Sequence, residues 1–178
     1  LPTFLGNHDM GRIGMMLSKA GYTGDDLLVR TKLANQIMYL TRGNPINYYG
    51  DEQGFTGTGG DKDSREDMFG TKVSQYASET LVGGGTMGTG DHYDTTAPLY
   101  KAIAKLAQVR QANPALADGA QIHRYASSDA GIYAFSRIDR RTGVEYIVAV
   151  NNATTAKSAA FQTYTANNKF TSVYGTSK

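Results

Sequence analysis

The chain has 178 residues, a formal net charge of +2 and no cysteine. This length suits one domain, or one domain and part of another. The charge is small and Lys and Arg are scattered, which argues against a nucleic-acid-binding protein. No apolar run approaches the roughly 18–20 residues of a membrane span. Disulfides and thiolate metal sites are excluded. The chain starts at Leu1 rather than Met, so we expect its natural start, with any secretion signal, to be missing. We favour a secreted bacterial protein over a cytoplasmic one.

The first 50 residues predict a strand, a helical segment and a second strand. Residues 2–6 are a short apolar run that we interpret as a buried strand, and residues 45–50 form another. Between them, residues 10–20 suit a short helix and residues 25–42 a longer one. The apolar face predicted for the longer helix consists of Val29, Leu33, Ile37 and Leu40. This order is a βαβ unit, which implies parallel pairing and a right-handed crossover.

A long Gly-rich stretch, residues 51–94, follows, with a short helix predicted over 71–81. Loops of this length in compact domains are usually functional or mobile. A helix then begins near Pro98, with Leu99, Ile103 and Leu106 on one face, and ends at Asn113.

From about residue 121 the residue pattern changes from helical to β-prone. Four β-prone runs predict an antiparallel β module, at residues 122–125, 131–136, 145–150 and 158–165. We place the domain boundary between residues 116 and 117, so that the two domains are 1–116 and 117–178. Arg137, Arg140 and Arg141 are interpreted as the polar side of a hairpin.

Polar residues that could bind a ligand or take part in a reaction directly follow the first strand. Asn7, His8 and Asp9 would stand at the C-terminal end of a parallel strand, where α/β proteins form their sites. An amide, an imidazole and a carboxylate there can converge on the hydroxyls of one sugar ring. One alternative is a capped strand end. Another is a metal-binding His-Asp doublet of the phosphohydrolase kind, but His92 and His123 fall in unrelated contexts.

Four segments together resemble the alpha-amylase family of glycoside hydrolases. Residues 4–9, Phe-Leu-Gly-Asn-His-Asp, resemble its strand-seven motif. Residues 43–52 resemble its strand-eight motif, residues 63–69 the Arg-bearing loop that follows, and residues 98–116 the last barrel helix and its exit. The resemblance covers about residues 1–120 and depends on four moderate matches in the right order. It implies the last strands and helices of a (β/α)8 TIM barrel, followed by part of an antiparallel β-sandwich domain.

The resemblance also implies a retaining hydrolase or transferase of α-glucosidic bonds in starch-like glucans. Asp9 would be the transition-state stabiliser, His8 would donate to the same sugar hydroxyls, and Asn7 would orient the pair. The nucleophile and the general acid, about 5–5.5 Å apart in such enzymes, belong to barrel strands four and five. Those strands precede Leu1, so we expect the 178-residue chain to be inactive without the remainder of the barrel.

Other candidate residues stay open at this point. Tyr49, with Tyr48, can stack on glucose rings or belong to the core, and core is the commoner role. Arg65 can pair with a site carboxylate or anchor its loop. The acidic residues between 61 and 66 lack calcium-loop spacing, so we expect no metal or cofactor in this segment, although calcium is possible elsewhere in the parent protein.

A second hypothesis is a non-catalytic carbohydrate-binding or structural module with an amylase-like sequence. Neither α-1,4 nor α-1,6 specificity, and neither hydrolysis nor transglycosylation, is favoured by these residues.

Overall fold

The computed structural model describes residues 1–57 and 59–175. The chain forms two compact units. The first unit contains residues 1–38 and 45–105, and the second contains residues 39–44 and 106–178. Among the described residues, no helix is both long and apolar enough to cross a membrane.

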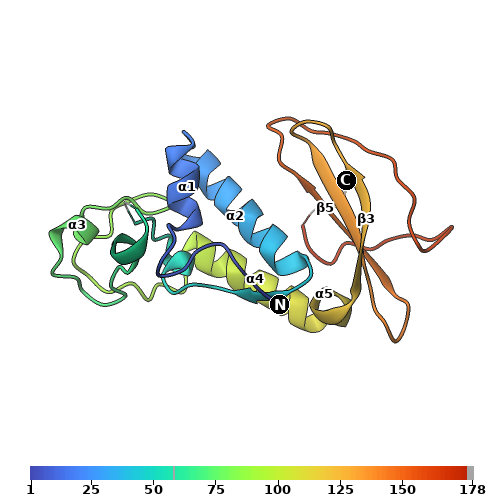
Figure 1. Cartoon of the computed structure of the whole chain (residues 1–178), viewed down its shortest axis with the longest axis horizontal. Helices are drawn as coiled ribbons and strands as arrows, with labels where there is room; N and C mark the ends of the chain where they lie inside the picture. The colour runs from blue at the N-terminus through green and yellow to red at the C-terminus, as the bar shows by residue number, and fades with distance from the viewer. Residues whose placement is uncertain (58, 176–178) are drawn as a thin grey trace. The chain divides into compact units, whose positions relative to one another are not determined.

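The first unit starts with the predicted βαβ order (Figure 1). Strands β1 (Pro2–Phe4) and β2 (Asn44–Ile46) are neighbours in a two-stranded sheet, and helices α1 (Ile13–Lys19) and α2 (Gly24–Leu40) lie between them in sequence. The interpretation of β1 as a buried strand is wrong for this chain, because Phe4 is 45% exposed. The sheet has only these two strands among the described residues, and Ile46 of β2 is also exposed, at 47%.

Helix α2 buries its predicted face only in part: Leu40 is buried at 7% exposure and Leu33 is half-buried. Leu27, Thr31 and Asn35 are buried, whereas Val29 is 60% and Ile37 38% exposed. The two polar side chains are satisfied within the helix: Thr31 Oγ1 donates to the Leu27 carbonyl at 2.8 Å and Asn35 Nδ2 to the Thr31 carbonyl at 2.9 Å. Because each finds its partner one turn back, burying it leaves no unpaired donor.

Helix α4 (Pro98–Ala112) has the predicted buried face, with Leu99, Ile103 and Leu106 at 1%, 7% and 0% exposure. Leu99 belongs to the small apolar core of the first unit, together with Leu27 and Val82. This core holds the long loop against the helices.

The stretch from 51 to 94 has little regular structure, as predicted. It contains the 3-10 turns η1 (Asp51–Gln53) and η2 (Asp61–Ser64), and the helix α3 (Ser74–Ala77) is shorter than the predicted one. Val82 donates its backbone N–H to the Gly54 carbonyl at 2.8 Å. Gly54 has φ of 87°, and a Cβ there would lie 2.5 Å from the Val82 carbonyl oxygen, so this close approach requires glycine.

The second unit contains the short helix α5 (Pro114–Asp118) and a three-stranded antiparallel sheet in the order β3-β4-β5 (Figure 1). The strands are β3 (Ala120–Ala126), β4 (Ile132–Ile138) and β5 (Glu145–Asn151). The prediction of an antiparallel module is confirmed for these three runs.

The fourth run, residues 158–165, is not a strand. The backbone N–H groups of Tyr164 and Thr165 donate to the carboxylate of Glu145, at 3.0 and 2.6 Å. A side chain thus accepts the hydrogen bonds that a neighbouring strand would otherwise take.

Two arginines of the second unit bind backbone carbonyls. Arg110 donates to the carbonyls of Tyr39, Thr41 and Gly43, where α2 ends. The placement of Arg137 on a polar hairpin surface is wrong: it is 1% exposed and donates to the Gly119 carbonyl at 3.0 Å. Burial lowers the pKa of Arg137 to about 10.

Candidate active site

The turn after β1 presents Asn7, His8 and Asp9. Asn7 Oδ1 accepts the backbone N–H groups of Asp9 and Met10, both at 2.8 Å, and so shapes the turn. His8 Nε2 lies 3.2 Å from Asp9 Oδ2, and these side chains are 62% and 68% exposed. An imidazole and a carboxylate therefore stand side by side, open to a ligand.

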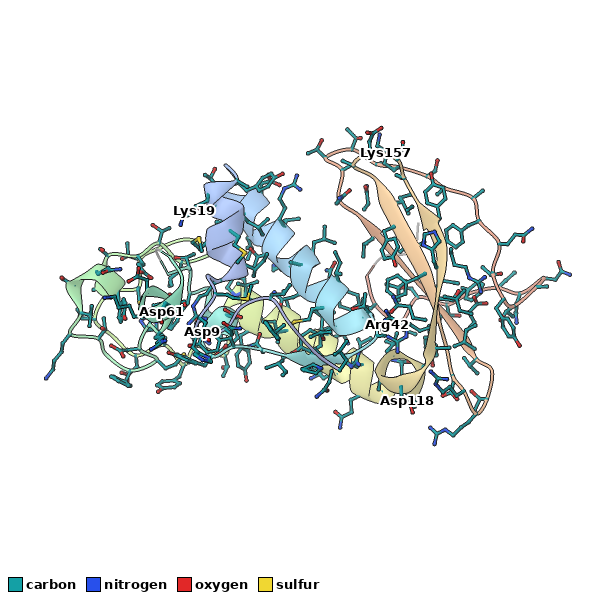
Figure 2. The ribbon with its side chains drawn as sticks, in the orientation of Figure 1. Asp9, Lys19, Arg42, Asp61, Asp118 and Lys157 are labelled. Carbon is teal, nitrogen blue, oxygen red and sulfur yellow. The ribbon has the colours of Figure 1, made fainter. Side chains whose placement is uncertain are left out.

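Arg65 reaches the same turn from the loop after β2. Its Nε donates to the His8 carbonyl at 3.2 Å, and its terminal nitrogen lies 3.6 Å from Asp9 Oδ1. The same nitrogen is hydrogen-bonded to Asp61 Oδ1, and the Asp61 N–H donates to the Asp9 carbonyl at 3.2 Å. Figure 2 shows Asp9 and Asp61 close together. The structure thus brings Arg65 to Asn7, His8 and Asp9, although 50 and more residues separate them.

Tyr49 follows β2 and is 40% exposed. Its ring meets the ring of Tyr48 edge-on, with centroids 4.6 Å apart. Burial of its hydroxyl and the neighbouring Tyr48 raise the pKa of Tyr49, so the phenol stays neutral. Tyr49 is therefore neither a fully buried core residue nor a fully open one.

Arg12, a buried side chain with several hydrogen bonds in this region, was not predicted from the sequence as a site residue. It is 0% exposed. Its guanidinium donates to the Tyr49 carbonyl at 2.8 Å, Asp51 Oδ1 at 2.7 Å, the Ser64 carbonyl at 3.0 Å and Glu66 Oε2 at 2.9 Å. Its place three residues after Asp9 and just before α1 was the available signal, but hydropathy alone predicts an exposed arginine there.

Arg12 is surrounded by buried carboxyl groups. Burial itself favours a neutral guanidine, but the charges of Glu66 and Asp51 raise the pKa of Arg12, which stays charged. Burial raises the pKa of Asp51 to about 6, even though Arg12 opposes this. Glu79 is also buried, and burial together with the neighbouring Glu66 raises the pKa of Glu79 well above its ordinary value.

Among the described residues, no group of three or more His, Cys, Asp or Glu could hold a metal ion. His92 packs edge-on against Phe55, and His123 stacks on Tyr133. The metal-dependent phosphohydrolase therefore has no support in the geometry.

The chain is similar to known proteins along most of its length. Residues 1–81 match the sequence model of the alpha amylase catalytic domain. Over 176 residues the chain is 56% identical to an alpha-amylase of Streptomyces lividans, an alignment that covers 98% of this chain. The chain belongs to the alpha-amylase family.

The amylase relatives are longer proteins. The chain spans 19% of the Streptomyces alpha-amylase and 20% of a cyclomaltodextrin glucanotransferase of Paenibacillus macerans, to which it is 32% identical over 97% of its length. It thus corresponds to about a fifth of each of these two relatives.

Solved amylase structures share the fold. The Anoxybacillus alpha-amylase superposes with a TM-score of 0.63 at 25% identity, covering 85% of this chain and 27% of that one. The alpha-amylase of Geobacillus thermoleovorans, whose structure is a complex with acarbose, gives 0.61 at 24% identity over 85% of this chain and 27% of that one.

Proposed function

We propose that this chain forms one wall of the active site of a glycoside hydrolase that cleaves α-glucosidic bonds in starch-like glucans. The observation that carries the proposal is the Asp9 carboxylate. It is 68% exposed, yet His8 lies against one of its oxygens and Arg65 near the other. An accessible carboxylate held in this way is suited to bind vicinal sugar hydroxyls in one orientation.

In this proposal Asp9 accepts hydrogen bonds from two hydroxyls of the reacting glucose, and His8 donates to one of them. Such contacts accelerate a reaction when they strengthen as the ring distorts toward an oxocarbenium-like transition state. Asn7 keeps the turn in place through its two backbone bonds. Arg65 orients Asp9, and the exposed part of the Tyr49 ring offers a surface for a glucose ring.

The retaining mechanism needs a nucleophile and a general acid about 5–5.5 Å apart. We propose that both come from other strands of a complete (β/α)8 barrel, and that the 178-residue chain alone does not turn over glucan. We also propose that residues 1–116 belong to this barrel and residues 117–178 to a separate β domain. No metal or cofactor is assigned to the chain in this proposal.

The decisive experiment uses the natural gene product that contains this chain. Asp9→Asn removes the charge and keeps the shape, and turnover of soluble starch should fall by about 100-fold or more, the scale on which one transition-state contact acts. Circular dichroism should remain unchanged. The matched control is Asp26→Asn, which alters an exposed carboxylate paired with Arg30 on α2 and should keep full activity.

Two outcomes would overturn the proposal. The first is an Asp9→Asn protein with normal turnover. The second is a wild-type gene product that binds maltooligosaccharides but never hydrolyses or transfers them, which would favour a non-catalytic carbohydrate-binding module.

A further inference from the structure

A buried arginine, Arg12, follows the turn that carries Asp9 and binds the loop that contacts this turn through Asp61 and Arg65. We infer that Arg12 is a positioning residue for Asp9, acting through its buried guanidinium. This inference rests on the proposed role of Asp9 in binding sugar.

The backbone of Arg12 links Asp9 to a helix. Arg12 is the residue before α1, with extended φ and ψ of −80° and 152°, and its carbonyl accepts the N–H of Met16 at 3.1 Å. Only Met10 and Gly11 separate it from Asp9. Any displacement of Arg12 is therefore transmitted over a very short backbone distance to the Asp9 carboxylate.

The side chain of Arg12 connects this turn to both loops that complete the candidate site. One acceptor is the carbonyl of Tyr49, itself a candidate site residue. Two others, the Ser64 carbonyl and the Glu66 carboxylate, flank Arg65 in sequence. The segment that holds Arg65 near Asp9 is thus bound on both sides of Arg65 by the same guanidinium.

Two further contacts stiffen the arrangement. The guanidinium carbon lies 4.7 Å from the centroid of the Tyr48 ring and 5.4 Å from that of Phe55, at cation–π distance. Ser64 Oγ, which is also buried, lies 2.9 Å from the Met10 carbonyl and 2.8 Å from the Asp61 carbonyl, the two acceptors nearest its single proton. Arg12 and Ser64 together close the space between the Asp9 turn and the Arg65 loop.

Lysine cannot reproduce this role. The guanidinium is a planar fork that keeps its charge when buried and reaches several acceptors in fixed directions. An ammonium on a flexible stem would satisfy some of the four acceptors and leave others buried and unpaired. We therefore expect that Arg12→Lys keeps the positive charge but no longer holds the Asp9 carboxylate in place.

The test is a double-mutant cycle in the natural gene product, with acarbose affinity by calorimetry as the readout. Arg12→Lys should weaken acarbose binding and lower kcat on soluble starch by about tenfold or more, since displacements of about 1 Å can cost 100-fold. In an Asp9→Asn background, the same change should weaken acarbose binding less than about twofold, because coupled sites are not additive. A merely structural role would give additive losses, and additive losses overturn the inference.

Ser64→Ala is the second variant, because Arg12→Lys alters a buried ion pair and can fail to fold. It removes the hydroxyl that lies within hydrogen-bond distance of the carbonyls of Met10, Asn7 and Asp61. It should lower kcat by a few fold in a protein that still folds, at a stability cost of about 1–3 kcal/mol for the lost buried hydrogen bond. Arg30→Gln, at an arginine of α2 that is 17% exposed and pairs with Asp26, is the control and should leave kcat unchanged. Wild-type kcat in both Arg12→Lys and Ser64→Ala would refute the inference.

The two proposals fail separately. If Asp9→Asn leaves acarbose binding and turnover intact, the proposed function is wrong whatever Arg12 does. If Asp9→Asn weakens acarbose binding and lowers turnover while a folded Arg12→Lys protein behaves as wild type, only the positioning role is wrong.

Discussion

Glu79 lies beside Glu66 in the interior of the first unit, and the pair is short of hydrogen-bond donors. Both carboxyl oxygens of Glu79 and the Oε1 of Glu66 are buried without a partner among the described residues. Arg12 binds only the other oxygen of Glu66. Two adjacent buried carboxylates cannot both be ionised at low cost, so burial and Glu66 raise the pKa of Glu79 to about 8.

The first prediction is that the first unit loses stability as the pH rises from about 4.5 to 8. Over this range folded Glu79 keeps a proton that the unfolded chain releases, so the folded state binds more protons and ΔG of unfolding falls with pH. Glu79→Gln, a neutral isostere, should flatten this slope and stabilise the protein at pH 8 by about 1–3 kcal/mol. Denaturant unfolding of the natural gene product from pH 5 to 9 measures both.

Glu52→Gln is the matched control, because Glu52 accepts a hydrogen bond from Asn47 and no buried pair is involved. It should keep the wild-type slope. An unchanged slope in Glu79→Gln would show that another group takes up the proton.

The second prediction concerns Glu145, whose side chain is fully buried in the second unit. Although burial acts in the opposite direction, hydrogen bonds from Ser136 and from the N–H groups of Tyr164 and Thr165 lower the pKa of Glu145 to about 2. Arg124 is also bound to it, at 3.1 Å. Glu145→Ala removes the carboxylate that pairs with Arg124, which keeps its bond to Ser136 Oγ, and leaves the backbone donors of Tyr164 and Thr165 without this acceptor. It should cost about 3–5 kcal/mol.

Denaturant unfolding measures the loss of stability, and limited proteolysis of the folded variant, in a separate experiment, shows which segment is released. Cleavage should appear in residues 152–170, because Glu145 accepts the backbone bonds of this segment. In the wild type, the contribution of Glu145 should be present above about pH 4.5 and should be lost as the pH falls toward 2. Asp129→Ala, at an exposed turn, should be neutral, and an equal loss from that variant would contradict the prediction.

The third prediction is that Arg110→Lys destabilises the second unit although the charge is kept. Arg110 donates to the carbonyls of Tyr39, Thr41, Gly43 and Ala117. A single ammonium cannot replace that set of bonds, so we expect a loss of about 1–3 kcal/mol. Arg42→Lys, an exposed neighbour, is the comparison in thermal unfolding and should change the midpoint much less.

How much of the fold could be predicted from the sequence depends on whether burial follows the spacing of apolar residues. The buried face of α4 follows from apolar spacing, and Leu99, Ile103 and Leu106 are buried as predicted. The buried face of α2 follows from it only in part: Leu40 is buried as predicted, but Thr31 and Asn35 are buried through bonds to carbonyls one turn earlier. Hydropathy assigns such residues to the surface.

The candidate site shows the same division. Asn7, His8 and Asp9 could be picked out because they are consecutive after a strand. Arg12 could not, because its four acceptors lie 37 to 54 residues away. Long-range pairing of this kind has no local pattern. Residues 158–165 failed as a strand for the same reason, since their backbone donors bind Glu145 from a distant part of the chain.

The last prediction separates two roles for Arg65, which is 46% exposed and lies near both Asp61 and Asp9. If Arg65 orients the Asp9 carboxylate, Arg65→Gln should lower kcat on soluble starch by about tenfold at an unchanged melting temperature, because an exposed ion pair contributes little stability. Asp61→Asn, which keeps the Arg65–Asp9 contact, should lower kcat much less. If Arg65 only anchors its loop, both variants should reduce kcat and melting temperature alike. Lys62→Gln on the same turn is the control for a lost positive charge. Steady-state kinetics and thermal unfolding of the wild type and the three variants decide between the two roles.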